Sequence, residues 1–180
     1  YFKRESQLMR QQITLLNDKV ELEKNLSKSV LTTIKSQMNP HFFYNALNTI
    51  QAYIFTNDKE KANSYLAKFS KLTRIVLEMS EKETVALHEE INSIKIYLDL
   101  EKMRFQENFD YLINIDEEVD TDLIEIPPML IQPYVENAIK HGLMKLSKGG
   151  TIKVIAYETQ ENYCVTVEDD GVGFDTNVLL

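Results

Sequence analysis

Long apolar runs are missing from this sequence of 180 residues, although hydrophobic residues make up 43% of it. A helix that crosses a bilayer needs about 20 consecutive, largely apolar residues, and the longest apolar stretches here fall far short of that length. We therefore expect neither a transmembrane helix nor a signal peptide in this sequence. Its hydrophobic content is enough for the cores of one or two small domains.

Positive charge and cysteine are also scarce. The 28 Asp and Glu residues outnumber the 20 Lys and Arg residues, which leaves a net charge of −8. No basic stripe is available to neutralise phosphates, so the composition argues against a nucleic-acid partner. The single cysteine, Cys164, cannot form an intramolecular disulfide, which fits a reducing compartment. Its place in an alternating apolar stretch predicts a small core residue rather than a reactive thiol.

Residues 1–56 contain no glycine and one proline, and apolar residues recur there at three- and four-residue steps. This pattern predicts one long helix of the coiled-coil or bundle type. Interruptions in its repeat fit a signalling helix that shifts register, and they also fit an irregular bundle. The opening Tyr1-Phe2-Lys3-Arg4 is typical of the cytoplasmic edge of a transmembrane helix, so we expect a juxtamembrane start.

Thr56-Asn57-Asp58 breaks the helical pattern, and Asn57 or Asp58 can cap a second helix over about 58–80. So short a connection predicts an antiparallel helical hairpin. One hairpin offers too little partner surface to bury both apolar stripes. We therefore predict a homodimer in which two hairpins form a four-helix bundle.

The pattern after residue 82 changes to that of an α+β domain, with helices on one face of a mixed sheet. The expected elements are a helix over 87–105, a strand over 111–115, a helix from Pro127-Pro128 to about His141, and two strands over 151–157 and 163–168 joined by a turn at 160–162.

Pro40 lies inside the first helical run, directly before His41. It removes a backbone hydrogen bond and should bend the helix, at a cost of about 3 kcal/mol. His41 and Asn45 share a helix face. A neutral imidazole is a good nucleophile, and the amide could orient a water or a phosphoryl oxygen beside it. From this spacing alone, a structural histidine beside a kink is the more common outcome.

Two later motifs carry groups suited to a nucleotide. Asn137 and Lys140 share one helical segment and offer an amide oxygen for Mg²⁺ and an ammonium for phosphate. Asp169, at the end of the last strand, can accept a hydrogen bond from an exocyclic amine, while Gly171 and Gly173 allow close backbone approach. Either motif alone is weak evidence, and both in this order are much stronger.

Together these segments resemble the LytS/YesM-type sensor histidine kinases over roughly residues 34–174. The resemblance is carried by QMNPHFFYNALNTI around His41, LHEEINSIKIYLDLEKMRF at 87–105, IPPMLIQPYVENAIKHGL at 126–143 and VEDDGVGF at 167–174. It implies a dimeric helical hairpin, which is a four-helix bundle in the dimer, followed by a truncated Bergerat-type α/β sandwich of the GHKL superfamily.

The resemblance also implies a separate role for each of three segments of the chain. Residues 1–36 would form a signalling helix, 37–82 the dimerisation and phosphotransfer hairpin, and 83–180 the ATP-binding domain. His41 would be phosphorylated from ATP and Mg²⁺, and the phosphoryl group would pass to an Asp on a response-regulator receiver domain. The chain would be the cytoplasmic portion of a bacterial inner-membrane protein.

The same resemblance assigns the nucleotide residues. Asn137 would coordinate Mg²⁺, and Lys140 would lie near the phosphates. Asp169 would bind the adenine amine, with Gly171 and Gly173 flanking the nucleotide.

Three departures from the family pattern limit this assignment. Phe42 stands where many histidine kinases have an acidic residue after the histidine, so the base must come from elsewhere, and Glu136 is our candidate. Pro133 stands where other GHKL proteins have Asn or Glu. The sequence ends at Leu180, before the expected lid and second glycine-rich box. We therefore expect weak or absent ATP binding by this length of chain, and exposed apolar surface on its sheet.

Several smaller expectations complete the sequence analysis. His88 should be a solvated or capping residue, and Arg104 should pair with Glu101 or Glu107. Two alternative functions stay open. One is a dimerisation or scaffold module with a degenerate nucleotide domain. The other is a GHKL ATPase without phosphohistidine, which would leave the motif at 37–48 unexplained.

Overall fold

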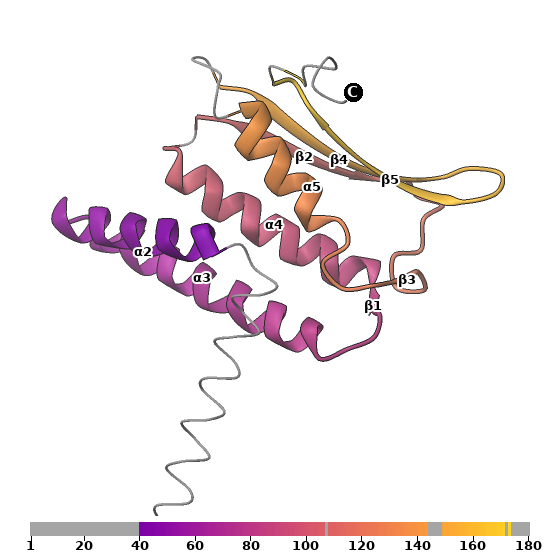
Figure 1. Cartoon of the computed structure of the whole chain (residues 1–180), viewed down its shortest axis with the longest axis horizontal. Coiled ribbons are helices and arrows are strands. Elements are labelled where there is room, and N and C mark those ends of the chain that lie inside the picture. The colour runs from indigo at the N-terminus through magenta and orange to yellow at the C-terminus, as the bar shows by residue number, and fades with distance from the viewer. Residues whose placement is uncertain (1–39, 107, 144–148, 172, 174–180) are drawn as a thin grey trace, which may run out of the picture. The chain divides into compact units, whose positions relative to one another are not determined.

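The computed structural model describes residues 40–106, 108–143, 149–171 and 173. From His41 onward these residues form one compact unit, in which a helical hairpin packs on an α/β part (Figure 1). The predicted helix over 1–36 and the helical turn before Pro40 lie outside the described residues. No helix in the described ranges is both long and apolar enough to cross a bilayer.

The hairpin consists of α2 (Pro40–Phe55) and α3 (Lys59–Ser80). Between them Asn57 has a φ of 57°, in the left-handed region that Asn tolerates better than most residues. The Asp58 side chain then caps α3 by accepting a hydrogen bond from the Lys61 backbone N–H at 3.1 Å. These two residues reverse the chain and confirm the predicted break.

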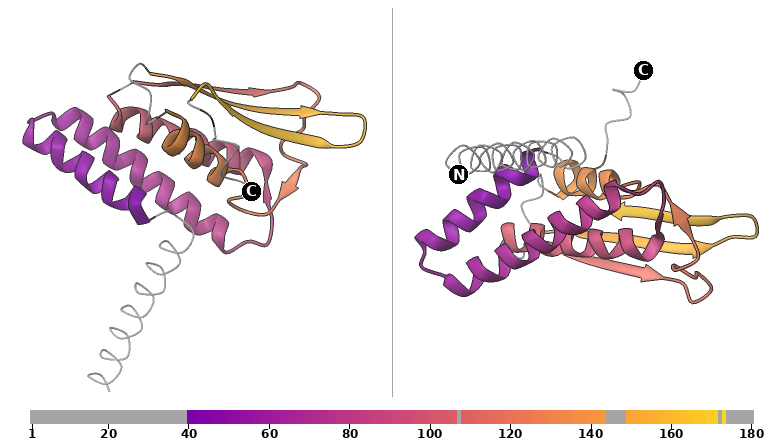
Figure 2. Two further views of the ribbon diagram at one scale, coloured as in Figure 1. Left: turned by 45° about the horizontal axis from the view of Figure 1, so that its top comes forward. Right: turned by 90° about the horizontal axis from the view of Figure 1, so that it is seen from below.

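Helix α4 (Leu87–Arg104) is buried on most of its circumference and lies between the hairpin and the sheet (Figure 2). Lys68 on α3 forms an ion pair with Asp99 on α4. The other carboxylate oxygen of Asp99 accepts a hydrogen bond at 2.5 Å from the hydroxyl of Tyr111, on the first strand of the sheet. One carboxylate thus joins the hairpin, the central helix and the sheet.

The sheet has the order β2-β4-β5, formed by β2 (Asp110–Ile115), β4 (Thr151–Glu158) and β5 (Tyr163–Asp169). Strand β4 runs parallel to β2 and antiparallel to β5. Ile152, Val154 and Ala156 alternate along β4 and are buried. Figures 1 and 2 show α4 and α5 on the same face of this sheet, so the predicted α+β class and mixed sheet are confirmed.

The helix predicted from Pro127-Pro128 begins later, and that prediction was wrong. These prolines follow β3 (Glu125–Ile126), which pairs with β1 (Val85–Ala86) in a small antiparallel ribbon that the sequence analysis did not predict. Met129 then has a φ of 60°, which a right-handed helix cannot include. Helix α5 (Gln132–Asn137) starts only after this turn, so Pro133 is the proline of its first turn.

A buried carboxylate on α4 determines where α5 begins. Glu90 is fully buried, and its Oε1 accepts hydrogen bonds from the backbone N–H groups of Ile131 at 2.5 Å and Gln132 at 3.3 Å. The first N–H groups of a helix have no intrahelical partner, and a negative charge is favourable beside them. Glu90 therefore caps α5 from a helix about forty residues earlier in the chain.

Replacing Glu90 by Gln should stabilise the fold in a pH-dependent way. Burial raises the pKa of the Glu90 carboxyl, although the backbone N–H groups oppose this rise. Because the folded pKa lies above the ordinary value of 4.5, the stability that Glu90 contributes is complete below pH 4.5 and is lost as pH rises through the raised pKa. Among the described residues, Glu90 Oε2 has no hydrogen-bond partner, and the Glu90→Gln substitution removes the charge that this buried carboxylate carries at high pH.

We expect Glu90→Gln to raise the free energy of unfolding by about 1–2 kcal/mol at pH 8 and to leave it unchanged at pH 4. Glu90→Leu should lower it by about 2–3 kcal/mol at both values, because the α5 N–H groups lose their acceptor. Urea unfolding at the two pH values measures both variants. An equal gain at pH 4 and pH 8 for Glu90→Gln would contradict the explanation by buried charge.

Candidate functional site

His41 is the second residue of α2, and its side chain is exposed. The Asn45 amide nitrogen lies 3.1 Å from His41 Nδ1, so the two side chains share a helix face as their spacing predicts. The amide group allows two arrangements. Its N–H can donate to an unprotonated Nδ1, or, turned around, its oxygen can accept the Nδ1–H and leave the lone pair on Nε2.

Phe42 anchors the start of α2 in the core. Its side chain is 4% exposed, and its ring centroid lies 5.0 Å from that of Tyr97 on α4 and 6.1 Å from that of Phe69 on α3. Aromatic pairs at these separations favour tilted and edge-to-face packing. The position where many histidine kinases have an acidic residue is therefore used here to hold the backbone of the neighbouring histidine.

A buried ion pair lies on α4. Glu101 is 2% exposed, and its carboxylate accepts hydrogen bonds from Arg104 Nε at 3.2 Å and 3.1 Å and a further one from Nη2. The guanidinium also lies over the Phe105 ring, 4.0 Å from its centroid. The predicted pairing of Arg104 with Glu101 is confirmed. The sequence analysis did not select Glu101 as a site residue, although an acid on the apolar face of a helix was a usable signal.

The charges of two candidate residues, His41 and Glu136, affect the pKa of the Glu101 carboxyl. Burial raises the pKa of its carboxyl, and Arg104 opposes this rise most strongly. The charge of Glu136 adds to the rise, while that of His41 works against it. His41 and Glu136 therefore lie within electrostatic reach of the same buried carboxylate, one from α2 and the other from α5.

Glu136 is partly buried and faces α4. Its carboxylate accepts a hydrogen bond at 3.1 Å from Gln132 Nε2, one turn earlier on α5. Its charge also helps to raise the pKa of Tyr97, for which burial is the larger cause. The described hydrogen bond of Glu136 thus lies within α5, while its charge acts on Tyr97 and Glu101 of α4.

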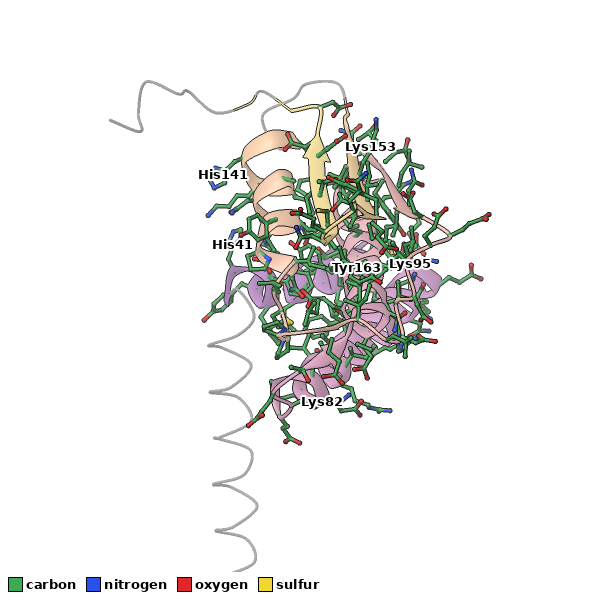
Figure 3. All side chains as sticks on the ribbon, turned by 90° about the vertical axis from the view of Figure 1, so that its right-hand side faces the viewer. His41, Lys82, Lys95, His141, Lys153 and Tyr163 are labelled. Atoms are coloured by element: carbon green, nitrogen blue, oxygen red, sulfur yellow. The ribbon has the colours of Figure 1, made fainter. Side chains whose placement is uncertain are left out.

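Helix α5 continues without a break into the π-helical turn η1 (Ala138–Gly142). The Leu143 N–H donates to the carbonyl groups of Ala138 and Ile139, which gives the wide spacing of a π-turn. Such turns occur frequently at functional sites. Asn137 and Lys140 are exposed along this segment. His141 and His41 point to the same side of the molecule in Figure 3.

The end of β5 packs against η1 at backbone distance. A Cβ atom on Gly142 would lie 2.3 Å from Asp169 Oδ1, and one on Gly171 would lie 2.3 Å from Gly142 Cα. The Gly171 N–H donates to Asp169 Oδ1 at 3.0 Å, and Gly173 has a left-handed φ of 69° that suits glycine. We call this contact of Gly142, Asp169 and Gly171 the β5–η1 junction.

The two adjacent aspartates at the strand end have different partners. Asp170 Oδ1 accepts a hydrogen bond from the Thr151 backbone N–H at 2.6 Å, which ties the end of β5 to the start of β4. The Asp169 carboxylate instead lies in the β5–η1 junction, beside the helical segment of Asn137 and Lys140. The fold thus brings together two motifs that are far apart in the sequence.

The described residues were also searched for groups of side chains that could hold a metal ion. In the ranges that the structure covers, no three or more His, Cys, Asp or Glu side chains are grouped to hold a metal ion. Mg²⁺ commonly takes one or two protein oxygens together with phosphates and waters. The exposed amide of Asn137 can supply one such oxygen beside the β5–η1 junction.

Comparisons with known proteins show which family the sequence resembles. A family model described as Histidine kinase matches residues 29–109. The sensor protein LytS of Staphylococcus haemolyticus is 37% identical over 160 residues, which cover 88% of this chain and 27% of the relative. The sensor histidine kinase/phosphatase LytS of Staphylococcus aureus is 34% identical over 157 residues, which cover 87% of this chain and 26% of the relative. The sensor histidine kinase YesM of Bacillus subtilis is 30% identical over 165 residues, which cover 92% of this chain and 28% of the relative.

These matches place the chain among the histidine kinases. More narrowly, the chain belongs to the LytS/YesM-type family of sensor histidine kinases. It spans about a quarter of the length of these relatives, at 26–28%.

Proposed function

We propose that this chain is the catalytic core of a sensor histidine kinase in a two-component system. His41 would receive the γ-phosphoryl group of ATP and pass it to an Asp on a response-regulator receiver domain. The observation that carries the proposal is the exposed imidazole of His41, which is hydrogen-bonded to Asn45 while the next residue, Phe42, is buried in the core. A histidine that receives a phosphoryl group needs a fixed backbone and an accessible ring.

In the proposed step, the Nε2 lone pair of neutral His41 forms a bond to the γ-phosphorus. The bond from that phosphorus to the bridging oxygen breaks, and ADP leaves with the electron pair. Asn45, with its amide oxygen accepting the Nδ1–H, would keep the lone pair on Nε2. Glu136 is the proposed acceptor of the ring proton. The chain contributes mainly positioning and charge neutralisation to such a reaction.

The β5–η1 junction supports the proposed nucleotide site. Asp169 would accept a hydrogen bond from the adenine amine, and the absence of Cβ atoms in the junction leaves room for its carboxylate. Asn137 would hold Mg²⁺, which supplies positive charge to the phosphates, and Lys140 would contact the same phosphates. Gly171 and Gly173 would allow the backbone to approach the nucleotide.

Exposed apolar side chains support the proposed homodimer. Tyr44, Leu47 and Ile54 recur at helical spacing along α2, and Phe55 at its end is 81% exposed. Leu66 on α3 is also exposed. A second hairpin would bury these residues in a four-helix bundle, which removes apolar surface from water.

The test uses the full-length protein. It is incubated with γ-labelled ATP and Mg²⁺ beside the His41→Ala variant, and alkali-stable, acid-labile label on protein is counted. We expect label on the parent and none on the variant. Label on neither protein, with ATP still bound, would overturn the proposal and favour the scaffold or ATPase alternatives.

Asn45 is also proposed to assist dephosphorylation of the regulator, since its amide could orient a water beside the phosphoryl group. One relative carries the name sensor histidine kinase/phosphatase. We expect Asn45→Ala to slow regulator dephosphorylation by about 10²-fold, the lower end of what a positioned group contributes. The exposed Asn48 on the same helix provides a control, and Asn48→Ala should leave the rate unchanged. Unchanged dephosphorylation by Asn45→Ala, with autophosphorylation intact, would refute this role.

A further inference from the structure

Helix α5 and the π-turn η1 form one continuous segment that carries Asn137 and Lys140 on its exposed side. Its other side is buried through Val135, Ala138 and Ile139. Apolar burial is non-directional, so it specifies the position of the segment along its own axis less sharply than hydrogen bonds do. The axial position of Asn137 and Lys140 therefore depends on what holds the two ends of the segment.

The C-terminal end of the segment is held by the β5–η1 junction. A Cβ on Gly171 would lie 2.3 Å from Gly142 Cα, so the two backbones meet without intervening side chains. Further approach of η1 to β5 is blocked by backbone atoms. A movement in the opposite direction opens the junction in which the Asp169 carboxylate lies.

The N-terminal end of the segment is held by the buried carboxylate of Glu90. Its Oε1 accepts the N–H groups of Ile131 at 2.5 Å and of Gln132 at 3.3 Å. Glu90 is 0% exposed and Gln132 is 1% exposed, so water does not readily replace the carboxylate as acceptor. The Gln132 side chain in turn donates to Glu136, the residue directly before Asn137.

The turn that leads into α5 has a backbone conformation that needs support. Met129 has a φ of 60°, a left-handed value that is uncommon outside Gly, Asn and Asp. Such a conformation persists where the surrounding structure over-determines it. The backbone groups of Met129 and Leu130 also lower the pKa of Glu90, so the carboxylate acts on the whole turn. Without the carboxylate, the turn can relax and the start of α5 can shift.

We propose that Glu90 is a positioning residue for the nucleotide site, because its hold on the start of α5 sets the separation of Asn137 and Asp169 that ATP–Mg²⁺ must span. This inference rests on the proposed kinase function and its nucleotide site. Glu90 touches no ligand and acts through the backbone of Ile131 and Gln132. The reach of its carboxylate oxygen matters for this role, and its negative charge does not. A displacement of about 1 Å by a residue far from the reacting groups can cost about 10²-fold.

The test compares three substitutions that separate reach from charge. Glu90→Gln keeps an acceptor oxygen at the same reach and removes the charge. Glu90→Asp keeps the charge and withdraws the carboxylate by one methylene group. Glu90→Leu removes both the acceptor and the charge. Leu72→Ala, at a fully buried position on α3, is the matched control, because it destabilises the core of the hairpin instead.

The Kd for ATP–Mg²⁺ and the thermal midpoint are measured for each variant of the full-length protein at pH 8, at a temperature where it is folded. We expect Glu90→Gln to bind as the parent does, Glu90→Asp to bind about 10-fold more weakly and Glu90→Leu about 100-fold more weakly. Leu72→Ala should keep the parental Kd despite its lower thermal midpoint. If Glu90→Leu fails to fold, Glu90→Gln and Glu90→Asp alone give the comparison of reach with charge.

Three outcomes would overturn the inference while leaving the kinase function intact. A parental Kd in folded Glu90→Asp would make the Glu90 cap purely structural. Weakening by Glu90→Gln as large as that by Glu90→Asp would assign the effect to charge. An equal loss in Leu72→Ala would assign it to general destabilisation. Failure of the parent protein to bind ATP–Mg²⁺ is a different result, because it would overturn the proposed nucleotide site itself.

Discussion

Gly171→Ala is expected to weaken ATP binding by about 10- to 100-fold, which corresponds to the loss of one hydrogen bond to a charged group. A Cβ at this position would lie 2.3 Å from Gly142 Cα and 2.5 Å from its carbonyl carbon. Both are backbone atoms, so β5 must separate from η1 to make room. The same overpacking should lower the free energy of unfolding by about 1–3 kcal/mol.

Gly142→Ala distinguishes loss of the site from loss of stability. Its Cβ would approach Asp169 Oδ1 at 2.3 Å, which is a side-chain atom that can rotate away. We expect a similar loss of ATP binding with a smaller loss of stability. Val154→Ala, in the buried centre of β4, should cost about 2 kcal/mol of stability and leave binding unchanged.

Calorimetric titration with ATP and Mg²⁺, together with urea unfolding, measures all three variants in the full-length protein. If Gly171→Ala binds ATP as tightly as the parent does, the β5–η1 junction is not the nucleotide site. If Val154→Ala loses binding equally, the losses reflect general destabilisation and the glycine variants carry no information about the site.

Arg104→Met is expected to lower the free energy of unfolding by roughly 3–5 kcal/mol at pH 8, because it leaves the buried Glu101 carboxylate unpaired. Burial already raises the pKa of Glu101, and Arg104 is the strongest opposing influence. Removing Arg104 should therefore raise that pKa further. The stability that a carboxyl with a raised folded pKa contributes is complete below its ordinary pKa and is lost as pH rises through the raised value.

The destabilisation by Arg104→Met should consequently be small at pH 4 and grow towards pH 8. Adding Glu101→Gln should restore most of the stability at pH 8, since no buried charge remains. Urea unfolding across this pH range measures both proteins. A loss that is equal at every pH would point to the lost stacking on Phe105, 4.0 Å away, as its cause.

Much of the fold could be predicted from local patterns. The break at Asn57 and Asp58, the helix from Leu87 and the strands at 151–158 and 163–169 follow from capping, periodicity and alternation, which depend on near neighbours in the chain. The start of α5 could not be placed in this way. The sequence analysis began this helix at Pro127-Pro128, whereas it begins at Gln132, where its first N–H groups reach Glu90.

Some features of the candidate site could likewise be predicted from local patterns, and others could not. The shared face of His41 and Asn45 is a consequence of helical spacing, and the glycines after Asp169 indicate close backbone approach. The π-turn at Ala138–Gly142 and the different partners of Asp169 and Asp170 were not predictable from spacing. They depend on how the end of β5 meets η1 on one side and the start of β4 on the other.

The sequence by itself therefore determined the α+β class, most of the helices and strands, the family and the candidate site residues, since each of these depends on short segments of chain. Only the tertiary structure decided that Glu90 caps α5, and that Gly142 touches Gly171. These partners are separated by long stretches of chain. Contacts of that kind form only when apolar faces pack together, and a local pattern does not specify which faces will meet.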